Sequence, residues 1–139
     1  MIIIDTNVLS EVLRPEPDVR VSTWLARQPS RQMYTTAISR AEINFGILAM
    51  PDGSRKARLS EAAQAMFDVY FSGRLLPFDE TAADEFASLS AGLKRVGRPM
   101  GIFDGMIASI VRSRGARLVT RNTKDFGECE IELIDPWNA

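Results

Sequence analysis

The N-terminal stretch MIIIDTNVLS places a carboxylate directly after the most apolar short run of the chain. Ile2, Ile3 and Ile4 are consecutive β-branched residues, and such a run predicts a strand that is buried on both faces. Asp5 ends this strand. Ligands of open α/β sheets bind in the crevice beyond the carboxyl ends of the strands, so we expect Asp5 to point into such a crevice.

Short apolar runs and amphipathic stretches alternate along the rest of the chain. Further strands are predicted at residues 33–38, 75–78, 117–120 and 131–134. Helices are predicted at residues 6–13 with Thr6 or Asn7 as the cap, 17–28, 39–50, 55–71, 80–96 with Asp79 as the cap, and 101–114 with Gly115 as a left-handed terminator. This alternation predicts a mostly parallel sheet in a three-layer α/β/α sandwich. No linker or repeat divides the 139 residues, so we expect residues 1–139 to form a single domain.

The charge balance and the cysteine content narrow the class of protein. There are 17 basic and 18 acidic residues, a net charge of −1, so a polyanion would have to bind at a local basic patch. Cys129 is the only cysteine, which excludes an internal disulfide and a cysteine zinc site and fits a reducing cytoplasm. No apolar stretch approaches the roughly 20 residues that span a bilayer. We therefore expect a cytoplasmic protein that does not enter a membrane.

The sequence contains no histidine. This excludes catalysis by Ser-His-Asp or Cys-His arrangements, and it excludes histidine-based zinc and iron sites. Carboxylates, hydroxyls and amides remain as the chemically active groups. These are hard oxygen donors, which suit Mg²⁺ or Mn²⁺.

Three acidic residues lie in segments that are otherwise apolar. Asp5 follows the three isoleucines, Glu42 lies in AISRAEINFGIL, and Asp104 lies in GIFDGMIASIV. Burial raises the pKa of a carboxyl group unless a cation or hydrogen-bond donors compensate, so such acids are seldom buried alone. A cation shared by all three would explain why each is tolerated.

Each acid also has a purely structural interpretation. Glu42 follows Ser39 at the spacing of a capping box, Asp104 lies in the first turn of its predicted helix, and Asp5 could cap the helix that follows it. None of these interpretations explains why all three host segments are so apolar. The shared metal ion accounts for the three acids at once.

The predicted strand 117–120 ends in a polar cluster, Thr120 to Asp125. Asn122 could supply a neutral amide ligand or orient a metal-bound water, whereas Asp125 could simply belong to a solvated turn. Candidate contacts to substrate are Thr6, Thr120, Arg121 and Lys124, because they adjoin the predicted site. Other basic residues could contact phosphates or could form solvated helix faces: Arg40, Lys94, Arg95, Arg98, Arg112, Arg114 and Arg117.

The segments IIIDTNVLSE, SRAEINFG, GIFDGMIAS and LVTRNTKDF, with DPWN at the end, resemble the PIN domain and, within it, toxin ribonucleases of the VapC and FitB type. The resemblance spans Met1 to Trp137. It implies an α/β/α fold around a parallel sheet and an acidic endoribonuclease site that depends on Mg²⁺ or Mn²⁺. The metal-site acids of the family fall on Asp5, Glu42 and Asp104, and its fourth acidic position falls on Asn122.

The resemblance also implies a mechanism and partners. Divalent ions held by the acids would activate water to hydrolyse an RNA phosphodiester bond. Toxins of this type form homodimers and are held inactive by a small antitoxin, often a ribbon-helix-helix protein that covers the acidic crevice.

Two rival functions remain open at this point. A degenerate PIN fold that only binds its ligands is conceivable because of Asn122. A phosphatase of the haloacid dehalogenase type also begins with an apolar strand and Asp-Thr, although its second Asp would fall on Asn7. Cleavage of RNA that depends on added Mn²⁺ would separate these functions.

Overall fold

Strand β1 (Ile2–Ile4) lies at the centre of a five-stranded sheet with the order β3-β2-β1-β4-β5 in the computed structural model, which describes residues 1–139. Every pairing in the sheet is parallel. β1 pairs with β2 (Met33–Thr36) on one side and with β4 (Arg117–Val119) on the other. The edge strands are β3 (Leu75–Leu76) and β5 (Glu132–Ile134). The prediction of a parallel sheet is confirmed.

Successive side chains of β1 belong to two separate apolar core clusters. Ile2 and Ile4 join one core cluster and Ile3 joins the other, as the two-residue period of a strand requires. All three are at most 2% exposed, and burying each such side chain contributes roughly 1.5–3 kcal/mol. β1 is therefore buried on both faces, as predicted.

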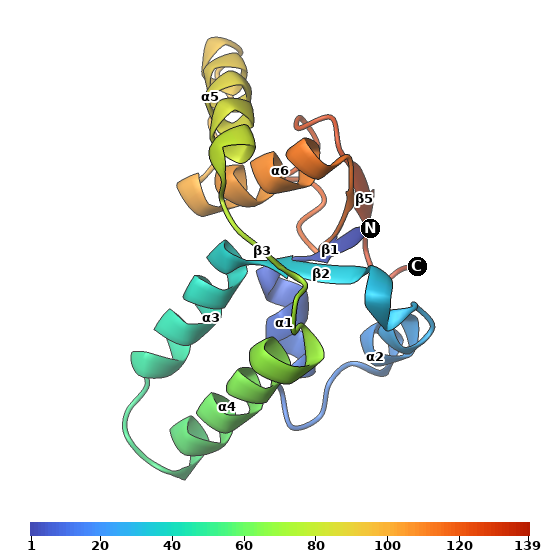
Figure 1. Cartoon of the computed structure of the whole chain (residues 1–139), viewed down its shortest axis with the longest axis vertical. Helices are drawn as coiled ribbons and strands as arrows, with labels where there is room; N and C mark the ends of the chain where they lie inside the picture. Colours follow the sequence, from blue (N-terminus) through green and yellow to red (C-terminus); the bar gives the residue numbers. More distant parts are fainter.

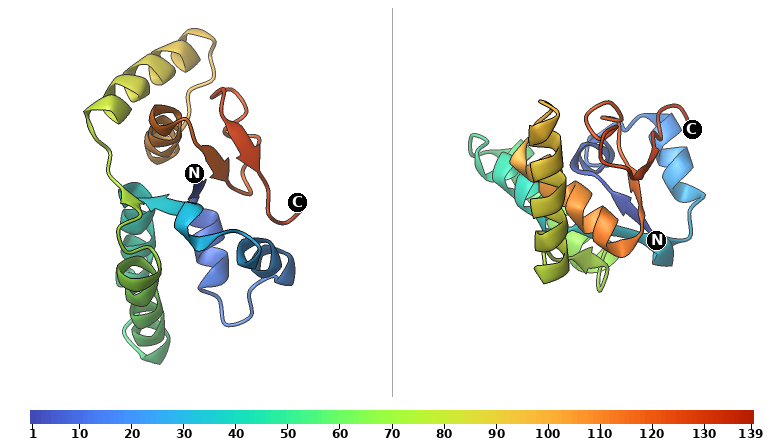
Figure 2. Two further views of the ribbon diagram at one scale, coloured as in Figure 1. Left: turned by 45° about the vertical axis from the view of Figure 1, so that its right-hand side comes forward. Right: turned by 90° about the horizontal axis from the view of Figure 1, so that it is seen from above.

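Helices cover both faces of this sheet and complete the three-layer sandwich (Figure 1). One layer contains α1 (Thr6–Val12), α2 (Val19–Ala26), α3 (Ala37–Leu48) and α4 (Ser54–Ala65), which continues into the π-helical turn η2 (Met66–Tyr70). The other layer contains α5 (Glu80–Arg95) and α6 (Ile102–Arg114). A 3₁₀ turn, η1 (Ser30–Gln32), precedes β2. Helices α3 and α4 lie side by side and extend away from the sheet as an arm (Figure 2).

The helix caps differ from the predicted ones at two places. Asp5 caps α1 in place of Thr6 or Asn7, because its side chain accepts the backbone N–H of Thr6, and this confirms the structural interpretation offered for Asp5. Thr36 caps α3 by accepting the backbone N–H of Ser39, so the predicted strand 33–38 ends at Thr36 and the helix begins two residues earlier than predicted. With Thr36 as the cap, the capping box between Ser39 and Glu42 does not form.

The other boundaries follow the turn chemistry of the sequence closely. Asp79 caps α5 by accepting the backbone N–H of Ala82, as predicted. Gly115 ends α6 with a φ of 60°, in the left-handed region that glycine favours. The predicted helix 17–28 begins at Val19, because Asp18 caps α2. None of the helices is long and apolar enough to cross a membrane.

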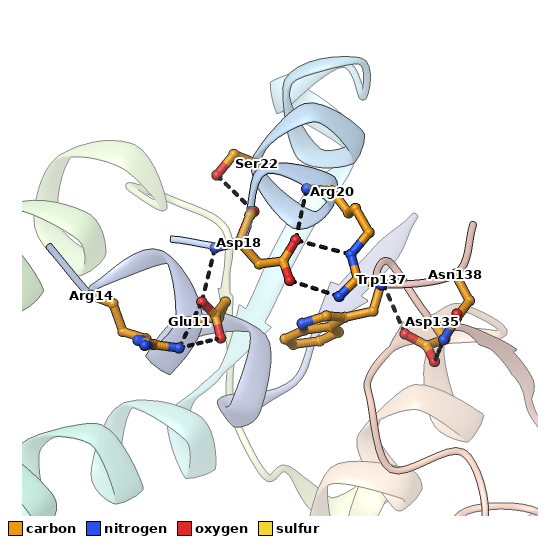
Figure 3. A network of polar contacts seen from close by, with 8 residues as sticks. All are labelled: Glu11, Arg14, Asp18, Arg20, Ser22, Asp135, Trp137 and Asn138. Carbon is orange, nitrogen blue, oxygen red and sulfur yellow. Dashed lines mark hydrogen bonds and ion pairs between the residues drawn. The ribbon is translucent and has the colours of Figure 1, made fainter. Parts of the chain in front are cut away.

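The buried carboxylate of Glu11 stabilises the loop between α1 and α2 through an ion pair and a hydrogen bond (Figure 3). Glu11 is 8% exposed and lies 3.3 Å from the guanidinium of Arg14. The same carboxylate accepts the backbone N–H of Asp18 at 3.0 Å. Asp18 in turn caps α2 and pairs with Arg20 at 2.8 Å. These bonds fix the start of α2 to the end of α1.

Candidate active site

Asp5 lies at the carboxyl end of the central strand and is 2% exposed. Its Oδ1 accepts the backbone N–H of Thr6 at 2.8 Å. Its Oδ2 accepts the hydroxyl of Thr120 at 2.7 Å and the amide of Asn7 at 3.2 Å. The carboxylate is thus hydrogen-bonded on both oxygens, but every donor is electrically neutral.

Glu42 comes from α3 and reaches the same region through Thr6. The Thr6 hydroxyl donates to Glu42 Oε1 at 2.7 Å, since a carboxylate can only accept. The buried hydroxyl of Ser39 lies 2.9 Å from the Thr6 oxygen and is left to donate to it. A chain of hydroxyls therefore connects the start of α1 to the start of α3.

Asp104 lies in the first turn of α6 and is half-buried. Burial raises its pKa, and the charges of Glu42 and Asp125 raise it further. Burial also raises the pKa of Asp5 to about 6, against the hydrogen bonds from Thr120 and Thr6, and the charges of Asp104 and Glu42 add to the rise. The three predicted acids thus lie within one another's electrostatic field.

No cation of the protein neutralises this group of acids. The eight ion pairs of the structure involve none of Asp5, Glu42 and Asp104. The acids are gathered but do not form a finished ion site, because no three acidic or cysteine side chains are arranged so that they could hold a metal ion as they stand. The donors suit Mg²⁺ or Mn²⁺ in chemical type and in uncompensated charge.

The residues that follow β4 have unequal positions. Thr120 is fully buried and donates its hydroxyl to Asp5, so in this structure it supports that carboxylate, and its contact with a substrate stays a prediction. The backbone N–H of Asn122 donates to the Thr120 hydroxyl, and its side chain makes no recorded contact with the acids. Asp125 is exposed but lies near enough to raise the pKa of Asp104. Asp125 therefore adds a negative charge close to Asp104, whereas the neutral side chain of Asn122 adds none.

Most of the basic residues considered as phosphate contacts are engaged elsewhere. Arg121 stacks on the ring of Trp137, with 4.7 Å between the guanidinium carbon and the ring centroid, while Lys124 is exposed. The others with acidic partners are Arg40 with Asp68, Arg98 with Glu128, Arg112 with Glu85, Arg114 with Asp79, and Arg117 with Glu132. These five arginines pair with acids at the protein surface, which favours the interpretation as solvated helix faces over that as phosphate contacts.

Two residues of the site were missed from the sequence. Asn7 connects Asp5, the Thr120 hydroxyl and the backbone N–H of Arg121. Ser39 supports Thr6 from a fully buried position. The available signal was the position of Asn7 in the first turn of the helix that Asp5 caps, where its amide is close enough to donate to the capping carboxylate.

Comparison with known proteins shows similarity over almost the whole chain. The chain is 37% identical over 137 residues to VapC ribonuclease Y4jK of Sinorhizobium fredii, covering 99% of this chain and 98% of that protein. It is 35% identical over 138 residues to Toxin FitB of Neisseria gonorrhoeae, with 99% of each chain covered.

Solved structures give the same result at the level of the fold. The structure of FitAB bound to an IR36 DNA fragment matches with a TM-score of 0.91 at 35% identity, covering 99% of this chain and 96% of that one. The crystal structure of FitAcB from Neisseria gonorrhoeae matches with a TM-score of 0.88 at 31% identity over the full length of both chains. The PIN domain matches residues 2–130. With this coverage, and with the parallel sheet and the gathered acids already in place, the chain belongs to the PIN domain family.

Proposed function

We propose that this chain is a metal-dependent endoribonuclease of the VapC and FitB type, the toxin of a toxin–antitoxin pair. The observation that carries the proposal is the set of Asp5, Glu42 and Asp104, which come from three distant segments, raise one another's electrostatic energy and have no cationic partner. Relatives named VapC ribonuclease and tRNA(fMet)-specific endonuclease support ribonuclease activity. The proposal covers residues 1–139 as a single PIN domain.

The chain's own residues divide the chemistry between them. Asp5, Glu42 and Asp104 would hold Mg²⁺ or Mn²⁺, with Asn122 or Asp125 at the edge of the site. A bound divalent ion lowers the pKa of water and stabilises the charge that develops on the phosphate. Thr120, Asn7 and the N–H of Thr6 fix the Asp5 carboxylate, so its orientation is set before substrate arrives. A carboxylate of the site that does not hold the ion directly would accept the proton from water.

Partners are part of the same proposal. The complexes FitAB and FitAcB, and VapBC complexes from other bacteria, support a cognate antitoxin for this chain, of the ribbon-helix-helix type that the resemblance implies. A homodimer is supported by large apolar side chains that are left exposed near the site. Phe45 on α3 is 75% exposed, and Ile102 and Phe103 at the start of α6 are 68% and 57% exposed.

The test is cleavage of RNA by the purified protein with Mn²⁺ or Mg²⁺, and with EDTA as the metal-free control. Asp104→Asn should lower kcat/KM by more than about 100-fold, because even a supporting residue of a metal site is worth 10–100-fold. Asp84→Asn on the exposed side of α5 removes the same charge far from the acids and should leave cleavage unchanged.

Two outcomes would contradict the proposal. A parent protein that binds RNA but never cuts it would establish the degenerate binding module instead. Cleavage that persists in EDTA would exclude the metal-dependent mechanism.

A further inference from the structure

A hollow of about 780 Å³ begins at Thr6 and Glu42 and runs along the arm. Three helices form its walls, each with residues at helical spacing on one face. Helix α1 and the residues directly after it contribute Thr6, Ser10, Leu13 and Arg14, and α3 and the turn after it contribute Glu42, Ile43, Gly46, Ile47 and Met50. Helix α4 contributes Arg55, Arg58, Leu59 and Ala62. We call this hollow the arm groove.

Charge is distributed unevenly along the arm groove. Glu42 and Thr6 lie at the end next to the sheet, where α1 and α3 begin. Arg14, Arg55 and Arg58 lie toward the far end, because α1 ends there and α4 begins there. The groove is thus acidic where the reaction is proposed and basic about two helical turns away.

Arg55 and Arg58 differ from the basic residues around the last helix and strand. Both are exposed, and neither takes part in any of the eight ion pairs or in a recorded side-chain hydrogen bond. Arg14 is partly neutralised by Glu11 at 3.3 Å. Two unpaired guanidinium groups on one wall of a groove are suited to bind an anion such as a phosphate.

Gly46 gives a second, independent indication that the groove is kept open. It lies in the middle of α3, where glycine costs about 1 kcal/mol relative to alanine. A Cβ atom at Gly46 would meet nothing within 4 Å, so packing does not require the missing side chain. The absence of a side chain leaves the backbone of α3 open to whatever lies in the groove.

We propose that the arm groove holds single-stranded RNA on one side of the cleaved bond, with Arg55 and Arg58 contacting its phosphates. This inference rests on the proposed ribonuclease function. The eight residue steps from Glu42 to Met50 span about 12 Å at helical rise, which matches about three nucleotides at roughly 3.4 Å per phosphate. Ile43, Ile47 and Leu59 form an apolar middle section between Glu42 and the arginines, and the faces of bases can lie against it while the phosphates face Arg55 and Arg58.

The first test measures binding, so it does not require cleavage. A fluorescent single-stranded oligouridylate is titrated in EDTA at several salt concentrations. Removing two phosphate contacts with Arg55→Gln/Arg58→Gln should flatten the slope of log affinity against log salt by about 1.4 and weaken binding about 25-fold at about 0.1 M salt. The matched control is Arg27→Gln/Arg31→Gln, which removes two exposed charges outside the groove and should change neither quantity.

The second test blocks the groove without removing a charge. Gly46→Leu fills the open space with an apolar side chain and should lower kcat/KM for RNA at least about tenfold, while the melting temperature stays the same or rises. Gly46→Ala gives the same gain in helix propensity with a much smaller side chain and should retain cleavage.

In the arginine double variant, KM should rise while kcat at saturating RNA stays unchanged, because the lost contacts are remote from the reacting phosphate.

The outcomes separate this inference from the proposed function. An arginine double variant that behaves like its control would overturn the RNA path, even if the parent protein cuts RNA. Tighter binding of an oligoglutamate than of the oligouridylate would assign the groove to an acidic peptide and would also overturn it. A parent protein that never cuts RNA would refute the ribonuclease, whereas salt-dependent binding through Arg55 and Arg58 would still support the RNA path.

Discussion

Asp5 and Glu11 are two buried acids at opposite ends of the same short helix, and their surroundings are opposite in kind. Glu11 is 8% exposed and is matched by the guanidinium of Arg14 and by a backbone N–H of the next loop. Asp5 is 2% exposed, has only neutral donors, and lies in the field of Glu42 and Asp104. One carboxylate holds the fold together, and the other is a source of unbalanced charge.

The contrast indicates that Asp5 lowers the stability of the folded protein, whereas Glu11 raises it. A buried charge that is matched by a cation and hydrogen-bond donors is a structural device, whereas one that other acids oppose weakens the folded state. Such a group persists where activity depends on it. Substitutions at the two positions should therefore change stability in opposite directions.

The largest expected effect on stability comes from Asp5→Asn. The pKa of Asp5 is raised from 3.8 to about 6, and at 1.36 kcal/mol per pKa unit the ionised group costs the folded state up to about 3 kcal/mol above pH 6. Asparagine keeps the helix cap but carries no charge. The variant should therefore unfold at higher urea concentration than the parent at about pH 8, and it should lose cleavage.

The pH dependence gives the sign of this effect. Between 3.8 and about 6 the folded parent binds more protons than the unfolded chain, so its free energy of unfolding falls as the pH rises through that window. Asp5→Asn removes this contribution, so its advantage should vanish below about pH 4. An equal advantage at about pH 4 and about pH 8 would show that charge is not the cause.

A divalent cation should reverse the destabilisation in the parent protein. Binding to the folded state alone stabilises it by about 2.7 kcal/mol when the ion is present at 100 times its Kd. Melting curves with and without Mn²⁺ should therefore differ for the parent and differ much less for Asp104→Asn. If the parent melts at the same temperature with Mn²⁺ as without it, the acids do not bind the ion.

The smallest effect is expected at the matched acid. Glu11→Gln keeps the shape of the side chain but weakens its bonds to Arg14 and to the Asp18 N–H, which should lower the free energy of unfolding by about 0.5–1.5 kcal/mol. Glu16→Gln in the same loop removes an exposed charge without an ion pair and serves as the control. Cleavage should be unchanged in both variants. If Glu11→Gln raised the free energy of unfolding, the two acids would not affect stability in opposite directions.

The fold was predictable from the sequence where local chemistry decided it. The isoleucine run, the Asp79 cap and Gly115 each specified an element with little dependence on the rest of the chain. The start of α3 was harder, because Thr36 is both a good strand residue and a good cap. In the structure it takes both roles, as the last residue of β2 and as the cap that accepts the backbone N–H of Ser39.

The candidate site was predictable in its acids and not in its supporting contacts. An acid in an apolar segment can be recognised from the linear sequence, and Asp5, Glu42 and Asp104 were found in this way. Ion pairs between distant residues cannot be recognised from the sequence. It therefore could not show that Arg114 and Arg117 have acidic partners while Arg55 and Arg58 have none. The sequence also could not show that the hydroxyl of Thr120 donates to Asp5, which it does because β4 pairs directly with β1.

The position of β1 between β2 and β4 has a consequence for synthesis of the protein. Its neighbour β4 begins at Arg117, so a growing polypeptide emerging from the ribosome carries Asp5 long before the strand that supports it exists. Asp104 and Thr120 also arrive late in translation. If these residues form the active site, we expect the nascent chain to be inactive toward RNA until nearly all of it has been made.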